Sequence, residues 1–508
     1  MQKQSFIKRK LSRVCLVSPP VNAVAHFEPY VATPMGLAYL GASLRERGFE
    51  VLALDAVAEA PYQADPINAT LVRYGLTVDK IVRRVLATRP DVVGLSCLYT
   101  NQWPVVREIA QALRAREPEI LLVTGGTHPT YDPESCLRDS KLNMIVLGEG
   151  DHTFPKALQC LNDGRGLDDL PGVAWRNGDA IRNNGTSPLI DDLDTLPFPA
   201  HDLFPIERYF KLALPPGYSM RSRRSLPIIT SRGCPCRCTF CASTVFWQHR
   251  YRARSADNVL AEIDWLRTQF GIEEVKFLDD NLTANRERAM HIFGALAKRS
   301  PRLHWNAPNG LAIWTVDDEM LKLMKSSGCF EIAIPVESGD QGVLNNLLHK
   351  PLLLEKALEI NRAARRLGIF RLGYFIIGFP GETRAQIDAT VRFSRRLDLD
   401  WNAMFIYTPL PGSPLFEECK NRGMLPAEYY ETGNVYFSPS LSSPEWNGAE
   451  LEKIIRREHL RNYLSIFKNP TVVIPSFLAL IRNRPGIFRF TLLRIVRTFK
   501  LALGIKDN

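Results

Sequence analysis

The chain has 508 residues, of which 45% are hydrophobic and 23% charged, and these are the proportions of a soluble globular protein with room for two or three domains. Four of its ten cysteines crowd into residues 234–241 and the others are scattered. This distribution argues against a disulfide-stapled secreted domain and favours a reducing cytoplasm, and no signal peptide is expected at the basic start. The net charge of +10 comes almost entirely from residues 451–508, which hold twelve Lys and Arg against three Asp and Glu. Because the rest of the chain is close to neutral, no nucleic-acid partner is expected.

The first part of the chain alternates short apolar runs with helical patterns. The runs predict buried parallel strands, and the patterns predict helices over Met35–Arg47 and Pro104–Arg116. The expected strands are Arg13–Ser18, Glu50–Leu54, Asp91–Ser96, Glu119–Thr124 and Asn143–Leu147. This alternation predicts a doubly wound, Rossmann-like α/β domain over residues 10–188, whose ligand should lie at the carboxyl ends of the strands.

A Pro-rich stretch over residues 189–222 predicts a linker, and a second strand–helix series follows it. The expected strands are Leu226–Thr230, Glu274–Leu278, Leu303–Asn306, Glu331–Val336, Leu372–Ile377 and Asn402–Tyr407. The expected helices are Asp257–Gln269, Asn285–Lys298, Asp317–Ser326, Glu355–Leu367 and Thr383–Leu397. Six such units predict a partial (β/α)6 barrel of the TIM type over residues 223–412, with its chemistry at the carboxyl ends of the strands.

Residues 413–508 predict a C-terminal helical region. A helix is expected over Leu451–Phe467, and Ile487–Leu503 has an amphipathic pattern with Arg and Lys on its polar face. No apolar run reaches the roughly 18–20 residues that are needed to cross a bilayer. The basic amphipathic helix would suit a peripheral contact with an anionic membrane, or it would dock on the protein's own core, and both interpretations stay open.

The most informative segment reads Cys234-Pro-Cys-Arg-Cys-Thr-Phe-Cys241, in which Cys234, Cys238 and Cys241 have the spacing C-x3-C-x2-C. Three thiolates can hold three irons of a cubic iron–sulfur cluster and leave the fourth iron open for a small molecule, whereas a structural cluster or zinc site normally uses four protein ligands. The segment therefore predicts a reaction centre. The alternatives are a zinc knuckle or a redox thiol group, and Cys236 is not expected to be a ligand because of its spacing.

Three further motifs come at the ends of expected barrel strands. Asp279-Asp280-Asn281 ends the second strand, where it would bind a polar ligand, or its asparagine or Thr283 would cap the next helix. Glu337-Ser338-Gly339 ends the fourth strand, where a buried carboxylate needs a partner. Gly378 and Gly381 follow the fifth strand in the segment IGFPGET. Because glycine has no side chain, another group can approach the backbone closely at these positions.

This order of motifs resembles the radical S-adenosylmethionine (SAM) superfamily, in which C-x3-C-x2-C follows the first barrel strand and an aromatic residue, here Phe240, precedes the last cysteine. The resemblance implies that the three cysteines ligate a [4Fe–4S] cluster, that the open iron chelates SAM, and that one electron cleaves SAM to methionine and a 5′-deoxyadenosyl radical. It implies that Glu337 and Ser338 bind polar groups of SAM and that the segment with Gly378 and Gly381 packs near the adenine. It also implies an electron donor such as flavodoxin or ferredoxin.

The N-terminal domain resembles the cobalamin-binding domain of B12-dependent radical SAM proteins through its segments VSPP, TGGTHPTYDPE and GEGDHTF. The residues implied to contact the corrinoid are Gly125, Gly126, Thr127, Gly148 and Glu149. The sequence lacks D-x-H-x-x-G, the motif that supplies a lower axial histidine, so cobalamin without histidine ligation is expected. His128 is either a corrin contact or a structural loop residue, and the alternative for the whole domain is a Rossmann-like fold without a corrinoid.

Together these resemblances identify the chain with the cobalamin-dependent, class B radical SAM methyltransferases. They imply that a radical removes hydrogen from an unactivated carbon, that methylcobalamin supplies the methyl group, and that a second SAM remethylates the cobalamin. The expected substrate is a small, lipid-like or membrane-associated metabolite, and the expected location is the cytoplasm or the inner face of the membrane. The alternatives are an oxidative cyclase of the anaerobic magnesium-protoporphyrin monomethyl ester cyclase type and a non-catalytic cobalamin or iron–sulfur sensor.

Overall fold

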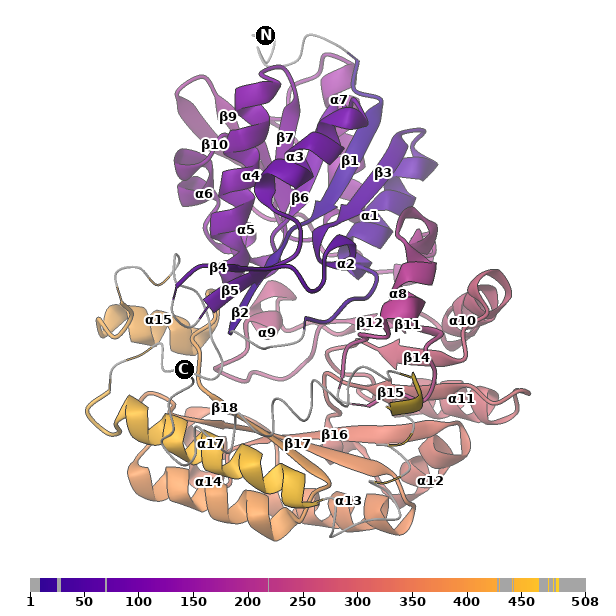
Figure 1. The fold of residues 1–508 in the computed structure, drawn as a ribbon, viewed down its shortest axis with the longest axis vertical. Coiled ribbons are helices and arrows are strands. Elements are labelled where there is room, and N and C mark those ends of the chain that lie inside the picture. The colour runs from indigo at the N-terminus through magenta and orange to yellow at the C-terminus, as the bar shows by residue number, and fades with distance from the viewer. Residues whose placement is uncertain are drawn as a thin grey trace. The chain divides into compact units, whose positions relative to one another are not determined.

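The computed structural model describes residues 10–24, 29–68, 71–217, 219–426 and 443–465, together with the isolated positions 429, 441, 474, 478 and 481–483. The chain divides into two compact units, of which the first runs to Tyr209 and the second begins at Phe210. Both units are α/β, as the sequence predicts (Figure 1).

Seven strands form the main sheet of the first unit, in the order β10-β9-β8-β7-β6-β1-β3. They are β1 (Arg13–Ser18), β3 (Glu50–Asp55), β6 (Val92–Ser96), β7 (Leu121–Gly125), β8 (Met144–Val146), β9 (Val173–Asn177) and β10 (Ala180–Asn183). The first five of these are parallel, and β9 and β10 form an antiparallel extension. The parallel part has the flavodoxin-like order, in which the direction of winding switches between β1 and β6, and such sheets bind ligands outside that point.

Helices cover both faces of this sheet. The pair α3 (Val78–Ala87) and α4 (Trp103–Arg116) share one apolar core with β1, β6 and β7, while α1 (Met35–Glu46) packs on α7 (Gly150–Asn162). The apolar spacing of α1 and α4 predicts these helices correctly. Helices α3 and α7 and the β9–β10 hairpin are absent from the predicted elements.

A small antiparallel sheet, in the order β2-β5-β4, stands beyond the carboxyl ends of β1 and β3. It consists of β2 (Val21–Val24), β4 (Ala64–Pro66) and β5 (Leu71–Tyr74). Arg73 attaches this small sheet to α4. Its guanidinium donates to the side chain of Asn22 in β2 and to both carboxylate oxygens of Glu108 in α4. This sheet is also absent from the predicted elements, since its strands are short and partly polar.

The segment over residues 189–222, expected as a linker, makes specific contacts in both units through its described residues. Near its start the Ile190 amide donates to the Glu149 carboxylate at 2.7 Å, and the Ala200 amide donates to the Ala38 carbonyl at 3.0 Å. It also contains α8 (Ile206–Leu212). Its end runs into a buried polar network of the second unit, where the amide of Ser222 donates to the carboxylate of Glu274 at 2.9 Å.

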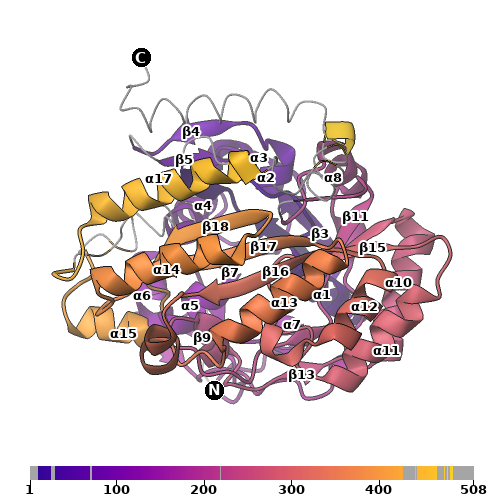
Figure 2. The ribbon, with the colours of Figure 1, turned by 90° about the horizontal axis from the view of Figure 1, so that it is seen from below.

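Six parallel strands form the sheet of the second unit, in the sequential order β11-β14-β15-β16-β17-β18, as expected for a partial (β/α)6 barrel. They are β11 (Ser225–Ile228), β14 (Glu274–Phe277), β15 (His304–Ala307), β16 (Cys329–Glu337), β17 (Phe370–Ile377) and β18 (Trp401–Ile406). The helices α10 (Ala256–Phe270), α11 (Arg286–Ala297), α12 (Asp318–Ser326), α13 (Leu354–Arg366) and α14 (Arg384–Leu397) cover its outer face (Figure 2). The predicted strands and helices overlap these elements, with bounds that differ by a few residues.

The last strand of this sheet, β18, is covered by α17 (Gly448–Ser465), which lies beside β18 and α14 in Figure 2. Asn462 of α17 pairs with the strand edge, because its side chain accepts from the Asn402 amide at 2.9 Å and donates to the Asn402 carbonyl at 2.6 Å. The side-chain amide of Asn462 therefore makes hydrogen bonds that a neighbouring strand would otherwise make, and it protects the edge of the sheet at β18.

The expected helix over Leu451–Phe467 corresponds to α17 as far as that helix is described. The expected amphipathic helix over Ile487–Leu503 lies outside the described residues. Among the helices that are described, none is both long and apolar enough to cross a membrane.

Candidate active site

The cysteine loop follows the short strand β12 (Ser231–Arg232) and leads into α9 (Ala242–Phe246). Cys238 is buried, and Cys234 and Cys241 are half-buried. The Cys241 amide donates to the Cys238 carbonyl at 3.3 Å, so these two residues belong to one turn. Gly233 begins the loop with φ +84°, and a Cβ atom there would stand 2.1 Å from the Arg250 carbonyl oxygen, which explains why glycine precedes the first cysteine.

Thr239, which lies between the second and third cysteines, attaches the loop to the rest of the barrel. Its amide donates to the Leu348 carbonyl at 3.0 Å and its hydroxyl donates to the Leu347 carbonyl at 2.7 Å. Its own carbonyl accepts from the Leu415 amide at 3.0 Å. The loop is therefore tied to two segments that lie far away in the sequence.

The acidic motif after β14 has three separate roles. Asp279 is buried and accepts from the amide and hydroxyl of Thr230 and from the hydroxyl of Ser231, so it joins the end of β11 to β12. Burial raises the pKa of Asp280, which accepts from Ser243 at 2.8 Å. Asn281 donates to the Cys234 sulfur at 3.6 Å, and its side-chain oxygen is buried with no hydrogen-bond partner among the described groups.

The capping role considered for Asn281 or Thr283 is wrong. Helix α11 is capped by Asn285, whose side chain accepts from the Arg288 amide at 3.0 Å. The hydroxyl of Thr283 is instead paired with that of Thr315 at 2.8 Å. Asn281 instead contacts Cys234, a predicted cluster ligand.

Glu337 ends β16 at an irregularity in its pairing with β17. Its φ of +65° is a left-handed conformation that non-glycine residues seldom adopt, and such strain often occurs at functional sites. Its carboxylate is buried and accepts from the Lys350 ammonium at 3.1 Å. The buried partner that the sequence analysis required for this carboxylate is thus Lys350, a residue that no motif singled out.

Lys350 also lies over two aromatic rings. Its Nζ is 5.9 Å from the ring centre of Phe240 and 5.5 Å from that of Trp314. Burial alone would lower the pKa of Lys350, but the charges of Glu337 and Cys238 outweigh that effect, so the pKa is raised. The ammonium is therefore charged at neutral pH.

The thiols experience different surroundings. Burial raises the pKa of Cys238 to about 11, although the charge of Lys350 opposes the rise. Hydrogen bonding lowers the pKa of Cys234 to about 6, chiefly through the Cys236 thiol and also through Asn281. Cys236 thus neighbours Cys234 directly, and its expected exclusion from the ligand set stays a prediction.

Two of the remaining residues that are predicted to contact SAM already make contacts within the protein. The Ser338 hydroxyl lies 3.1 Å from that of Thr390 and accepts from the Asp340 amide. Gly378, at φ +81°, is in a conformation that favours glycine, and a Cβ atom there would stand 2.6 Å from a methyl group of Leu451. Gly381, at φ +82°, faces open space. Their contacts with SAM stay predictions.

A hydrophobic wall connects the cysteine loop with the ends of β17 and β18. The ring of Phe379 is 6.0 Å from that of Phe240 and 4.9 Å from that of Tyr407. Beneath it, Glu382 accepts from the amides of Gly378 and Phe379, and burial raises its pKa to about 8. The three rings thus form a continuous aromatic contact between the cysteine loop and the ends of these strands.

Within the described part of the chain, no group of three or more His, Cys, Asp or Glu side chains is arranged so that it could hold a metal ion. The donor set nevertheless fits an iron–sulfur cluster. Three thiols share one loop, the Asn281 amide points at one of them, and a buried ammonium offsets their charge. The residues present are therefore suited to a cluster held by three cysteines.

In the first unit, the predicted corrinoid residues lie at the carboxyl ends of β7 and β8, as expected. Gly126 has φ +121°, and a Cβ atom there would stand 2.4 Å from the Cys97 carbonyl oxygen, so the loops after β6 and β7 meet through backbone atoms. Thr127 begins the short helix α5 (Thr127–Tyr131). Gly148 has φ +75°, and the neighbouring Glu149 is buried.

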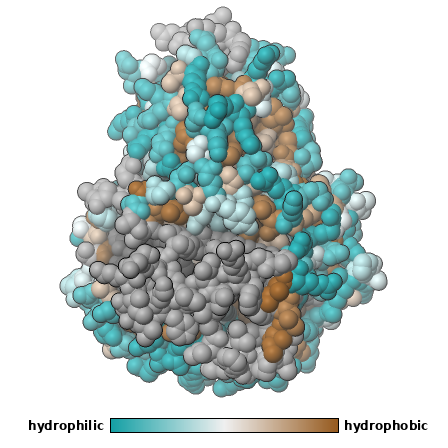
Figure 3. Space-filling model, in the orientation of Figure 1, coloured by the Kyte–Doolittle hydropathy of each residue, from teal (hydrophilic) through white to brown (hydrophobic). Residues whose placement is uncertain are grey.

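Large apolar side chains are exposed at the same end of the sheet. They follow β3 and β6 and are 41–68% exposed: Tyr62, Ile67, Leu98 and Tyr99. Most of the described surface that faces the viewer in Figure 3 is hydrophilic, with smaller hydrophobic patches between. An apolar edge with close-packed glycine loops is suited to a flat organic ring.

His128 does not belong to that exposed edge. Its side chain is buried and lies 5.6 Å, ring to ring, from Trp103. Burial lowers its pKa to about 4, so the imidazole is neutral. Of the two interpretations of this residue, the structural one agrees with its position.

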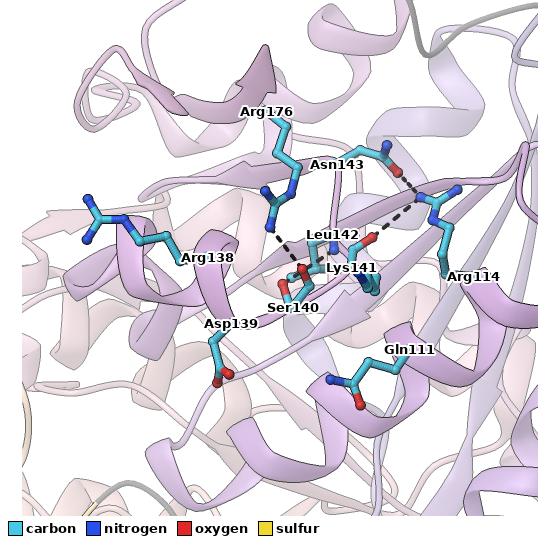
Figure 4. Close-up of a pocket in the computed structure, with 9 residues that line it drawn as sticks. All are labelled: Gln111, Arg114, Arg138, Asp139, Ser140, Lys141, Leu142, Asn143 and Arg176. Atoms are coloured by element: carbon cyan, nitrogen blue, oxygen red, sulfur yellow. Dashed lines mark hydrogen bonds between the residues drawn. The ribbon is translucent and has the colours of Figure 1, made fainter. Parts of the chain in front are cut away.

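A groove of about 610 Å³ lies at the opposite, amino-terminal end of β8 (Figure 4). Arg114 and Arg176 line it, but their guanidinium groups already donate to Asn143 and to backbone carbonyls such as that of Ser140. These arginines hold the turn before β8 in place. The groove is thus separate from the edge that is suited to a cofactor.

Comparisons with known proteins agree with this division. Residues 23–158 match the B12 binding domain and residues 228–394 match the radical SAM superfamily. The chain is 34% identical to cytidylyl-2-hydroxyethylphosphonate methyltransferase of Streptomyces wedmorensis, over 88% of this chain and 89% of that protein. It is 29% identical to an uncharacterized methyltransferase of Pyrococcus horikoshii, over 92% of this chain and 94% of that protein.

Among solved structures, the fold is similar to that of the radical SAM methyltransferase TsrM from Kitasatospora setae, with cobalamin and a [4Fe-4S] cluster bound. The TM-score is 0.64 at 19% sequence identity, and the match covers 81% of this chain and 75% of that chain.

Proposed function

This chain belongs to the cobalamin-dependent radical SAM methyltransferases, and from that premise we propose that it transfers a methyl group to an unactivated carbon of a small molecule. Its cofactors are a [4Fe–4S] cluster, SAM and cobalamin. The observation that carries the proposal is the cysteine loop at the open end of a six-stranded barrel, with Asn281 and the Glu337–Lys350 pair beside it.

When bound, the cluster supplies the electron that cleaves SAM, and cobalamin supplies the methyl group. The chain's own residues bind the cluster, orient SAM and shield the reacting groups from water. Cys234, Cys238 and Cys241 hold the cluster, and the buried Glu337 offers a carboxylate to the polar end of SAM. The aromatic wall of Phe240, Phe379 and Tyr407 excludes water, which protects a reactive radical from side reactions.

The first unit contributes the cobalamin site in this proposal. Its exposed apolar side chains would offer a surface to a flat macrocycle, and the glycine loops after β7 and β8 would allow the corrinoid tail to approach the backbone. The ordinary position for such a ligand is the switch point between β1 and β6, at the same edge. Gly125, Gly126, Thr127, Gly148 and Glu149 are the residues proposed to surround it.

Candidate substrates are of two kinds. The relative that is 34% identical is named for a nucleotide-linked phosphonate, so such conjugates are the first substrates to assay. The basic pattern of Ile487–Leu503 supports a lipid-like or membrane-borne substrate instead. Deleting residues 487–508 should then release the protein from anionic vesicles in a co-sedimentation assay, and unchanged binding would remove the membrane proposal.

The proposed reaction has a direct test. The anaerobically reconstituted protein, given SAM and a one-electron reductant such as reduced flavodoxin, should release 5′-deoxyadenosine. Mass spectrometry of extracts from cells with and without the gene should reveal a product heavier by one methylene group. A product that has lost hydrogen without gaining carbon would favour the oxidative cyclase, and a loaded protein that releases no 5′-deoxyadenosine would favour a sensor.

A further inference from the structure

Lys350 is a buried ammonium group that none of the sequence motifs explains. Its side chain is 5% exposed, and it follows the short π-helix η5 (Val343–Leu347) in the segment LLHKPLL. Lysine is rarely buried without a partner, because removing its charge from water is costly. Its described contacts are one carboxylate, that of Glu337, and the faces of the Phe240 and Trp314 rings.

The position of Lys350 relative to the cysteine loop is fixed by the backbone. Two hydrogen bonds join Thr239 to the carbonyls of Leu347 and Leu348, three and two residues before Lys350 in the sequence. The ammonium then lies 5.9 Å from the ring centre of Phe240, the residue between Thr239 and Cys241. The charge is thus held beside the thiols.

A charge in this position acts on the reduction of the cluster. Three thiolate ligands make the cluster site anionic, and each reduction adds one further negative charge. A buried cation nearby favours the reduced form, and burial keeps solvent and salt from screening it. Glu337 carries the opposite charge and therefore acts in the opposite direction.

We propose that Lys350 is a positioning residue of the reaction, which raises the reduction potential of the cluster and holds Glu337 in its strained conformation through their ion pair. The inference rests on the proposed function, because it presupposes a cluster on Cys234, Cys238 and Cys241. The reduction is a one-electron transfer from an external reductant to the cluster. Lys350 itself forms no bond to the reacting atoms.

The test is a redox titration of anaerobically reconstituted protein without SAM, followed by electron paramagnetic resonance. At the wild-type midpoint potential, Lys350→Met should lower the ratio of reduced to oxidised cluster at least tenfold, which is about 59 mV for a one-electron couple. Lys350→Arg keeps the charge and should stay close to wild type. Glu337→Gln should move the midpoint in the opposite direction, to a higher potential.

The control is Lys322→Met, which removes a lysine from the exposed pair with Asp318 on α12, where the two charged atoms are 2.8 Å apart. It should leave the midpoint unchanged. If Lys350→Met fails to take up iron, Glu337→Gln decides alone, since a higher midpoint supports the proposal and an unchanged one contradicts it. An unchanged midpoint in iron-loaded Lys350→Met overturns it as well. Failure of the proposed function differs from both results. The wild-type protein would then either hold no cluster to titrate, or titrate normally while releasing no 5′-deoxyadenosine with SAM and a reductant.

Discussion

The two proposed cofactor sites of this molecule differ in the groups that line them. At the end of the barrel, side chains form the site: three thiols, an amide and a buried ion pair stand together. At the proposed corrinoid edge of the first unit, backbone atoms dominate, because Gly126 lies against the Cys97 carbonyl and apolar side chains such as Tyr99 remain exposed. A site formed by side chains should therefore lose its cofactor when one donor side chain is removed. A site formed by the backbone should lose its cofactor when a Cβ atom is added to one of its glycines.

The largest effect should follow the loss of a cluster cysteine. Cys238→Ala removes the buried member of the donor set and should abolish both iron binding and 5′-deoxyadenosine release. Cys236→Ala removes the neighbouring thiol and should keep most of both. Iron analysis and product chromatography measure the two variants side by side. Equal losses in both would show that the spacing does not identify the ligands.

The matching change at the other edge is Gly126→Ala. The added Cβ would stand 2.4 Å from the Cys97 carbonyl oxygen at a φ of +121°, so the loop must move or the unit must lose roughly 2 kcal/mol or more in free energy of unfolding. Corrinoid content should fall, while iron content stays near wild type.

Gly164→Ala is the control, since φ is also positive there and a Cβ atom would meet no atom within 4 Å. Calorimetry and absorbance of the bound corrinoid report the two quantities. Full corrinoid binding in Gly126→Ala would mean that the glycine loop is not part of the site.

This contrast explains what the sequence could predict. Apolar runs between helical patterns locate all six barrel strands and the five parallel strands of the first unit. The cysteine spacing predicts a reaction centre, and that assignment stays a prediction. Lys350 could not be found in the same way, because its significance depends on Thr239 meeting Leu348 across the fold. The role of Asp279 was equally hidden, since its partners Thr230 and Ser231 lie about fifty residues earlier.

A smaller effect concerns a buried carboxyl group at the barrel edge. Burial raises the pKa of Glu382 to about 8, so the folded unit binds this proton more tightly than the unfolded chain does. Its contribution to stability is complete below about pH 4.5 and is lost as the pH rises through about 8, by at most about 1.4 kcal/mol per pH unit.

Glu382→Gln keeps the shape without the titration. Unfolding measured between pH 5 and pH 8 should therefore depend less on pH in the variant than in the wild type. The expected gain of the variant relative to wild type is largest at the alkaline end. Parallel curves would contradict the raised pKa.

The most direct measurement is spectroscopy and iron analysis of the anaerobically reconstituted protein before and after the addition of SAM. About four irons per chain are expected, with a reduced-cluster resonance that changes when SAM reaches the open iron. Zinc in place of iron, or a cluster whose resonance ignores SAM, would contradict the central claim that three cysteines leave one metal corner open for chemistry.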